Sequence, residues 1–267
     1  MAYNLNFHQT FKPERNHISS LLSIEHLNAT KEEISHQFSI PTGSSSGKVE
    51  VNLLYSQAAG LLTFTKKKEL FIINRTHLGD VIYENDSFLE HELTQLLFHY
   101  MFCSKNSELV LWELLFTNYH KGSYKVEVTD FRKFAEKTLS AKNIKFAPLW
   151  GTYISEDPLI NIGVLKHYKK GEYHFGEISI ISHYFHWYAL FLYHFLQEFD
   201  NNRNNFTLEE LQFSGFPQIF GWDSGNIRKI LELIESKNYL NLNKQFSNYH
   251  IYLNKDLDEL INTLTYI

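Results

Sequence analysis

Two carboxylates stand side by side at Glu156 and Asp157, directly before Pro158. Carboxylate oxygens bind divalent cations, and a Mg²⁺ or Mn²⁺ ion held by them would assist cleavage of a phosphodiester bond. A structural interpretation competes with this one, because Asp followed by Pro is typical of a helix N-cap and the first helical residue. Glu156 and Asp157 are therefore candidate metal-binding and catalytic residues, with a helix start as the alternative.

His8 is a third candidate catalytic residue. It stands between Phe7 and Phe11, with Lys12 and Arg15 close behind. An imidazole beside cations can contact a phosphate or act as a general base. The aromatic neighbours are equally typical of an N-terminal arm packed onto the protein, so both interpretations stay open.

Three consecutive lysines, Lys66, Lys67 and Lys68, separate two short segments in which apolar residues alternate. Such alternation predicts two strands, and the lysines then mark the tip of a hairpin. Lysines in this position neutralise DNA phosphates and release counterions. An ordinary solvated turn is the alternative.

A hydroxyl-rich loop precedes a predicted helix and offers groups that position a phosphate. Its candidate DNA-binding residues are Thr42, Ser44, Ser45, Ser46 and Lys48. The loop differs from a nucleotide-binding P-loop, because only three residues separate its glycines and a valine follows the lysine. We therefore expect no bound nucleotide.

These residues need a scaffold of two helices and a hairpin over residues 29–75. The capping box from Thr30 to Glu33 starts a short helix, and Ile40-Pro41 ends it. A second helix, the candidate recognition helix, is predicted by apolar residues at helical spacing, namely Val51, Leu54, Ala58 and Leu61. With the hairpin as a wing, this segment predicts a winged helix-turn-helix that binds DNA.

The rest of the chain is predicted to be mainly helical. We expect a helix over 17–27, a linker over 76–86, three helices between 87 and 140, and a strand over 173–181. The last third repeats the opening pattern, with a long helix over 183–199, a capping box from Thr207 to Glu210, a helix after Ser224 and a hairpin over 240–253. This second hairpin lacks a lysine cluster, so it is expected to serve packing or dimerisation.

The predicted fold class is therefore mainly α with short β-hairpins (α+β), with winged helix-turn-helix modules at both ends of a helical middle region. The expected domains are residues 1–85, 86–181 and 182–267.

Composition limits the possible functions. The 267 residues have a net charge of −5, so any contact with a polyanion is local. Residues 41–76 carry five cations against two carboxylates, and Lys12, Arg15 and Arg75 complete the predicted DNA-binding set. Cys103 is the single cysteine, which excludes an internal disulfide, and we find no signal peptide or membrane-length apolar run. These features predict a cytoplasmic protein.

Several of these segments together resemble the bacterial domain-of-unknown-function 4007 family, over most of the chain. The most distinctive is the loop from Thr42 to Lys48. The others are residues 7–11, 29–50, Tyr55 with Gly60-Leu61, 93–100, Trp112 and 156–159.

The resemblance implies a role in bacterial defence. Members of the family sit beside genes for DNA phosphorothioation, in which sulfur replaces a non-bridging phosphate oxygen, and the Ssp-type member is described as a DNA-nicking protein. The family usually has Glu after the opening histidine, whereas this chain has Gln9. An amide is a poorer metal ligand than a carboxylate, which weighs against nicking.

We therefore expect a DNA-binding protein of a phosphorothioation-linked defence system that nicks one strand before sulfur insertion, using Mg²⁺ or Mn²⁺. Its expected partners are double-stranded DNA, phosphorothioation enzymes of the same operon and a second copy of the chain. A winged-helix transcription regulator and a non-catalytic interaction scaffold are the alternatives.

Overall fold

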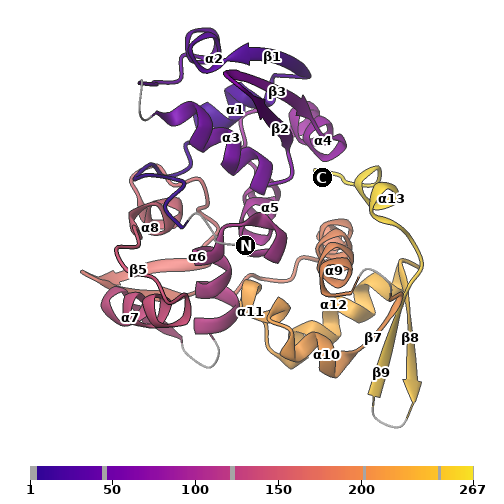
Figure 1. The fold of residues 1–267 in the computed structure, drawn as a ribbon. Helices are drawn as coiled ribbons and strands as arrows, with labels where there is room; N and C mark the ends of the chain where they lie inside the picture. Colours follow the sequence, from indigo (N-terminus) through magenta and orange to yellow (C-terminus); the bar gives the residue numbers. More distant parts are fainter. Residues whose placement is uncertain (1–4, 44–46, 121–123, 201–202, 246–247, 267) are drawn as a thin grey trace.

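The computed structural model describes residues 5–43, 47–120, 124–200, 203–245 and 248–266. Small antiparallel sheets lie around a buried helix, α5 (Glu92–Cys103) (Figure 1). This arrangement confirms the α+β class. None of the helices in the described ranges is long and apolar enough to cross a membrane.

The N-terminal module forms a three-stranded sheet in the order β1-β3-β2 with three helices packed on it. The predicted capping box at Thr30 is confirmed, since Thr30 Oγ1 accepts from the N–H of Glu33 and the Glu33 carboxylate accepts from the N–H of Thr30. Its elements are α1 (Arg15–Leu22), β1 (His26–Thr30), α2 (Lys31–Phe38), α3 (Lys48–Ala58), β2 (Leu62–Lys67) and β3 (Leu70–Arg75).

Two local predictions in this region were wrong. The helix expected over 17–27 ends at Leu22, and β1 follows because its residues pair with β3. The expected linker over 76–86 is a helix, α4 (His77–Asp86). Thr76 caps that helix by accepting from the N–H of Gly79, while Leu78 and Ile82 are buried.

The middle region contains a sheet of its own, in the order β4-β6-β5, which the prediction of a helical middle omitted. The strand expected over 173–181 is limited to β6. The sheet was missed because β4 is very short and β5 is exposed apart from its first residue. The elements are η1 (Lys105–Ser107), α6 (Val110–Glu113), the π-helical η2 (Leu114–Tyr119), β4 (Lys125–Glu127), α7 (Val128–Thr138), α8 (Ala147–Ile154), β5 (Leu165–Lys169) and β6 (Glu172–Phe175).

The C-terminal module forms a sheet in the order β7-β9-β8. Its capping box at Thr207 and its hairpin register, with Leu240 opposite Leu253, confirm the sequence predictions. The elements are η3 (Ser182–Tyr184), α9 (Phe185–Phe199), β7 (Asn205–Thr207), α10 (Leu208–Phe213), α11 (Phe216–Phe220), α12 (Ser224–Ser236), β8 (Leu240–Gln245), β9 (Asn248–Leu253) and α13 (Leu257–Ile261).

The same order of elements therefore occurs in all three regions. Each contains, in this order, a helical segment, a strand, two helices and two strands, and in each sheet the last strand lies between the first and the second. The C-terminal copy carries two further short helices, α11 before α12 and α13 after β9. The sequence indicated this repetition for the two ends only.

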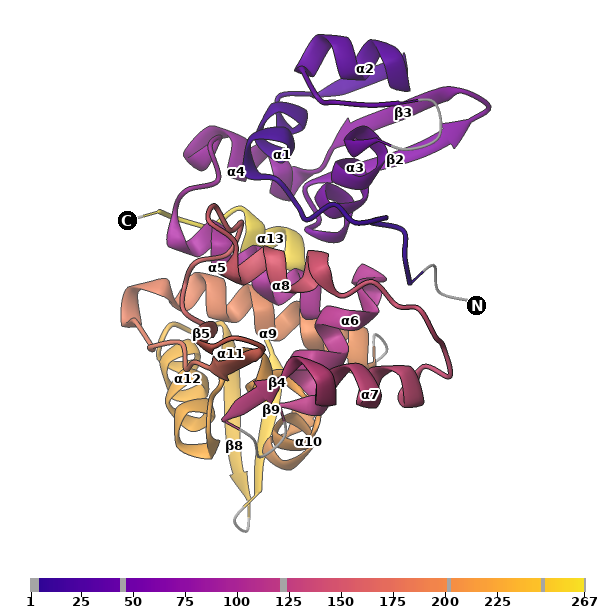
Figure 2. The same cartoon turned by 90° about the vertical axis from the view of Figure 1, so that its left-hand side faces the viewer.

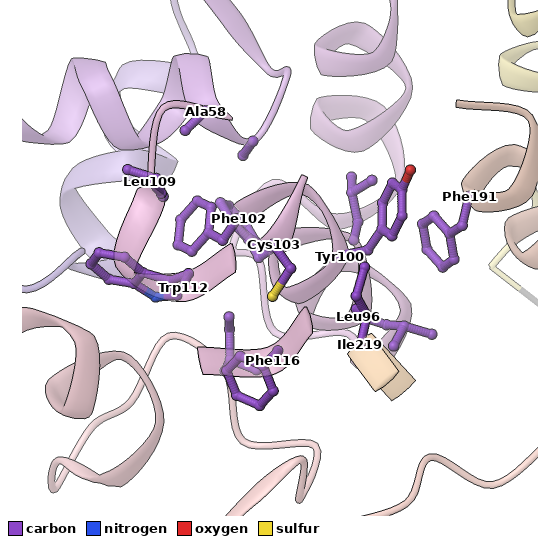
Figure 3. Close-up of a cluster of buried hydrophobic side chains, with 14 of the residues drawn as sticks. Ala58, Leu96, Tyr100, Phe102, Cys103, Leu109, Trp112, Phe116, Phe191 and Ile219 are labelled. Carbon is purple, nitrogen blue, oxygen red and sulfur yellow. The ribbon is translucent and has the colours of Figure 1, made fainter. Parts of the chain in front are cut away.

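The core lies around α5, which is buried on nearly every side. Figure 3 shows Phe102 close to Trp112 on one side and Tyr100 facing Phe191 on the other. The ring centroids of Phe102 and Trp112 are 6.1 Å apart, and those of Tyr100 and Phe191 are 4.7 Å apart. Aromatic contacts of this kind stabilise the core beyond the area that they bury.

His99 connects α5 to the middle region and to the C-terminal module. Its Nε2 lies 2.6 Å from the carbonyl oxygen of Ile219, and its Nδ1 lies 3.0 Å from the hydroxyl of Tyr153. Burial lowers the pKa of His99 to about 4, so the ring is neutral at pH 7. A carbonyl only accepts, so Nε2 carries the proton and Nδ1 accepts from Tyr153.

We predict that His99→Ala lowers the free energy of unfolding by about 3–5 kcal/mol, because it leaves a cavity and two buried polar groups unpaired. Urea denaturation followed by tryptophan fluorescence measures the change. The control is His36→Ala, at an exposed position of α2, with an expected effect within about 0.5 kcal/mol. A cost for His99→Ala no larger than the control's would contradict the bridging role.

Candidate nucleic-acid interface

The β2–β3 hairpin carries the predicted lysine cluster at its tip. Figure 2 shows the hairpin extending beyond the helices of its module. Lys66 Nζ lies 3.5 Å from Glu50 Oε2 and 4.9 Å from the centroid of the Phe71 ring. Lys67 and Lys68 are exposed, and neither has a side-chain partner in the described part of the chain. The tip therefore presents to solvent two cations without an ion-pair partner, next to the exposed carboxylate of Glu69.

The loop before α3 is closed by its own backbone. Thr42 and Gly47 form an antiparallel bridge, and a Cβ at Gly47 would lie 2.2 Å from Thr42 Oγ1, so only glycine fits there. Lys48 Nζ lies 2.6 Å from Glu14 Oε1, which compensates its charge. The predicted phosphate-binding hydroxyls of Ser44, Ser45 and Ser46 lie outside the described residues.

The candidate recognition helix, α3, is largely buried. The N-terminal arm covers part of it, since the Tyr55 hydroxyl donates to the Phe11 carbonyl and Asn52 Oδ1 accepts from the N–H of Glu14. Few residues of α3 reach solvent, and they include one cation and one carboxylate: Lys48, Glu50, Leu54 and Gln57. Any contact with a DNA groove therefore depends more on the hairpin than on this helix.

Arg75 links elements of its own module. Its Nε lies 2.6 Å from Asp80 Oδ1, one terminal nitrogen donates to the Leu22 carbonyl at 3.0 Å, and the guanidinium lies over the Tyr83 ring. The Arg75 side chain is mostly buried. These contacts use the groups that a phosphate would require.

Lys12 and Arg15 tie the N-terminal arm to the segment after α8. Arg15 donates to the carbonyls of Pro158 and Leu159 at 2.8 and 3.0 Å. Lys12 Nζ lies 2.6 Å from the Ser155 hydroxyl and also donates to the Asp157 carbonyl. Both cations thus anchor residues 155–159, and neither lies at the hairpin tip.

Glu156 and Asp157 lie on an exposed bend where α8 has ended. The alternative of a helix start at Pro158 is wrong, because residues 158–164 form no helix. Glu156 lines a hollow of about 480 Å³ together with Lys166 and His167. The described residues contain no group of three or more His, Cys, Asp or Glu side chains that could hold a metal ion. The two carboxylates alone do not make a complete cation site, and a metal there stays a prediction.

His8 is buried among aromatic rings. It is 1% exposed, and its ring centroid lies 5.1 Å from that of Phe7 and 6.4 Å from that of Trp112. Neither ring nitrogen has a hydrogen-bond partner among the residues that the structure describes. Burial, with Lys145 nearby, lowers the pKa of His8 to about 4. This neutral ring fits the packed arm, and it does not line the hollow that contains Glu156.

The β5–β6 hairpin is a second basic surface that sequence reasoning missed. It exposes Lys166, Lys169 and Lys170, and it also exposes the ring of Tyr168. The signal that could have found it is the one used for the first hairpin, two lysines and a turn glycine between segments rich in alternating aromatic residues.

Three small antiparallel sheets around buried helices define an α+β protein, and solved structures with this fold exist. A crystal structure described as magnesium ion-bound SspB matches with a TM-score of 0.72 and 13% identity, over 96% of this chain and 85% of that chain. A second SspB crystal structure matches with a TM-score of 0.71 and 14% identity over the same shares. This likeness shows a shared fold.

No protein-family model matches the sequence, and neither does any curated protein. The resemblance to the domain-of-unknown-function 4007 family therefore stays a prediction.

We predict that His8→Phe stabilises the protein and weakens its sensitivity to acid. The pKa of His8 is about 4 in the folded state and near 6.5 when unfolded, so the unfolded chain binds the proton more tightly. Wild-type stability is therefore lost as the pH falls from about 6.5 to about 4, by up to about 3 kcal/mol for this group. Urea denaturation across this pH range measures the difference. Parallel pH profiles for the two proteins would show that His8 is not responsible.

Proposed function

We propose that this chain binds double-stranded DNA through the β2–β3 hairpin, acting as the wing of a winged helix. Support comes from the order of elements, in which two helices after a short strand are followed by a two-stranded hairpin. The order β1-β3-β2, with the hairpin's second strand in the centre, is what a winged helix requires. The pairing of β1 with β3 reaches Leu70 at the end of the hairpin, and the turn residues Lys68 and Glu69 beyond it are exposed.

The observation that carries the proposal is the pair of exposed cations at Lys67 and Lys68, neither of which has a side-chain partner among the described residues. Every other predicted DNA-binding cation has a carboxylate, hydroxyl or carbonyl partner, as in the Lys48–Glu14 ion pair of 2.6 Å. A cation without such a partner can replace a condensed counterion on a phosphate, which is the source of affinity for DNA. We infer that the hairpin tip contacts the phosphate backbone.

The proposed setting is a bacterial DNA phosphorothioation system of the Ssp type. Two observations support this setting. One is the fold that the chain shares with the SspB structures, and the other is the motif resemblance described above. The partners in this setting are phosphorothioation enzymes of the same operon. Strand nicking at Glu156 and Asp157, assisted by Mg²⁺ or Mn²⁺, is the proposed extension, and one of the SspB structures is described as bound to magnesium.

We predict that Lys67→Ala/Lys68→Ala weakens binding of duplex DNA roughly tenfold to 100-fold at about 0.1 M salt. The slope of log affinity against log salt should become shallower by about 2, because two phosphate contacts are lost. Fluorescence anisotropy with a labelled duplex at several salt concentrations measures both quantities. The control, Lys137→Ala/Lys142→Ala, removes two exposed lysines elsewhere and should leave the slope nearly unchanged.

The alternatives give different results in the same experiment. Equal salt slopes for the two double variants would refute the hairpin as the contact, and no binding by the wild type would favour an interaction scaffold. Strong preference for one duplex sequence over scrambled competitors would favour a transcription regulator.

We predict that the purified protein converts supercoiled plasmid to open circle only with Mg²⁺ or Mn²⁺, and that Glu156→Gln/Asp157→Asn abolishes this conversion. Agarose gels with an EDTA control measure it. Nicking that persists in the variant would move the catalytic site elsewhere. Retardation of the plasmid without nicking would leave DNA binding as the function.

A further inference from the structure

Three rings meet on the outer side of the middle sheet. Tyr168 and Tyr124 are 60% and 70% exposed. Tyr168 is stacked on His174, with ring centroids 4.2 Å apart and planes at 15°, while Tyr124 meets the edge of His174 at 5.6 Å. We refer to Tyr124, Tyr168 and His174 as the ring face. Large exposed aromatic patches usually mark a binding surface.

The sheet positions the ring face by alternation. His174 on β6 stands opposite Lys125 on β4 and Lys166 on β5, so these three share one side of the sheet. The adjacent Tyr173 turns the other way and stacks on Trp150 in the interior. Figure 1 shows β5 at the periphery of the molecule.

An irregularity in β5 brings Tyr168 onto the ring face. The register with β6 shifts between His167 and Lys169, where one extra residue is accommodated. Such bulges re-aim a side chain and often lie beside functional sites. Here the extra residue is Tyr168, whose ring lies nearly parallel to that of His174.

The surroundings of the ring face are basic. Lys166 and Lys170 are exposed and have no side-chain partner among the residues that the structure describes. The hairpin's one carboxylate, Glu172, is buried and faces three cationic or protonatable groups: Lys169 Nζ at 3.2 Å, Lys125 Nζ at 3.9 Å and His174 Nε2 at 3.5 Å. Glu127 on β4 is likewise paired with Lys125 at 3.4 Å.

We propose that the ring face, with Lys166 and Lys170, binds single-stranded DNA. Flat exposed rings stack on unpaired bases, whereas a duplex keeps its base faces covered, and the lysines follow the phosphates. Protein interfaces are depleted in lysine, so this combination favours a nucleic acid over a protein partner. This binding is independent of the duplex contact proposed for the β2–β3 hairpin.

The hollow beside Glu156 adjoins this surface, because Lys166 and His167 line it and belong to the same strand. A single DNA strand whose base stacks on Tyr168 can therefore run along β5 toward Glu156. The ring face thus offers a place for one DNA strand separated from its complement, next to the carboxylate predicted to act on it.

The test measures binding of a single-stranded oligothymidylate and of a duplex by fluorescence anisotropy, using the full chain. Tyr168→Ala and Tyr124→Ala should each weaken single-strand binding about tenfold. Both should leave duplex binding unchanged, and Lys67→Ala/Lys68→Ala should give the opposite pattern. The matched control is Phe88→Ala/Phe213→Ala, because these rings are also exposed, at 72% and 75%.

A second readout separates stacking from a change in fold. A fluorescent adenine analogue in the single strand should be quenched by the wild type and by Tyr168→Phe, which keeps the ring. The quenching should be lost with Tyr168→Leu, which keeps the apolar character but not the ring.

Equal single-strand affinity for the wild type, Tyr124→Ala and Tyr168→Ala would overturn the proposal. So would equal weakening by the Phe88→Ala/Phe213→Ala control. Self-association that is lost in the tyrosine variants, without an effect on the oligonucleotide, would assign the ring face to a second copy of the chain and also overturn it.

Discussion

The structure depends on the burial of α5. A helix in the centre of a protein satisfies its own backbone, but each of its polar side chains needs a partner, since an unpaired buried polar group costs about 1–3 kcal/mol. The partners come from distant parts of the chain. Thr94 meets the Tyr266 hydroxyl, Gln95 Oε1 accepts from the N–H of Asn161, and Tyr100 meets His194. These contacts fix the C-terminal module and the middle region, which carries the β5–β6 hairpin, against one central helix.

The same requirement decides which cations can bind a ligand. Arg15 and Arg75 donate to main-chain carbonyls of distant segments, so their guanidinium groups hold those segments together. Lys67 lies at the end of β2, and Lys68 and Lys170 lie on the hairpin turns, where their side chains are exposed and have no partner among the described residues. In a chain of net charge −5, local pairing therefore determines the field that a polyanion meets more than total charge does.

Features formed by residues that are close in the sequence could be predicted, whereas features that depend on distant residues could not. The capping boxes at Thr30 and Thr207 and the lysine tip at Lys66 to Lys68 involve residues a few positions apart, and all were predicted. Helix α4 was missed because Gly79, three residues after its cap, is a residue type that disfavours helices. The anchoring role of Arg15 could not be predicted, since its acceptors lie 74, 143 and 144 residues away.

The turns of the two basic hairpins differ in the residue that adopts the left-handed backbone conformation. Each turn contains a residue with left-handed backbone, Lys68 with φ of 57° and Gly171 with φ of 78°. Glycine adopts this conformation freely, whereas a lysine there costs roughly 1–2 kcal/mol. In the β5–β6 turn, glycine takes the strained position and the adjacent Lys170 carries the charge. The β2–β3 turn instead accepts the strain and gains a third lysine at its tip.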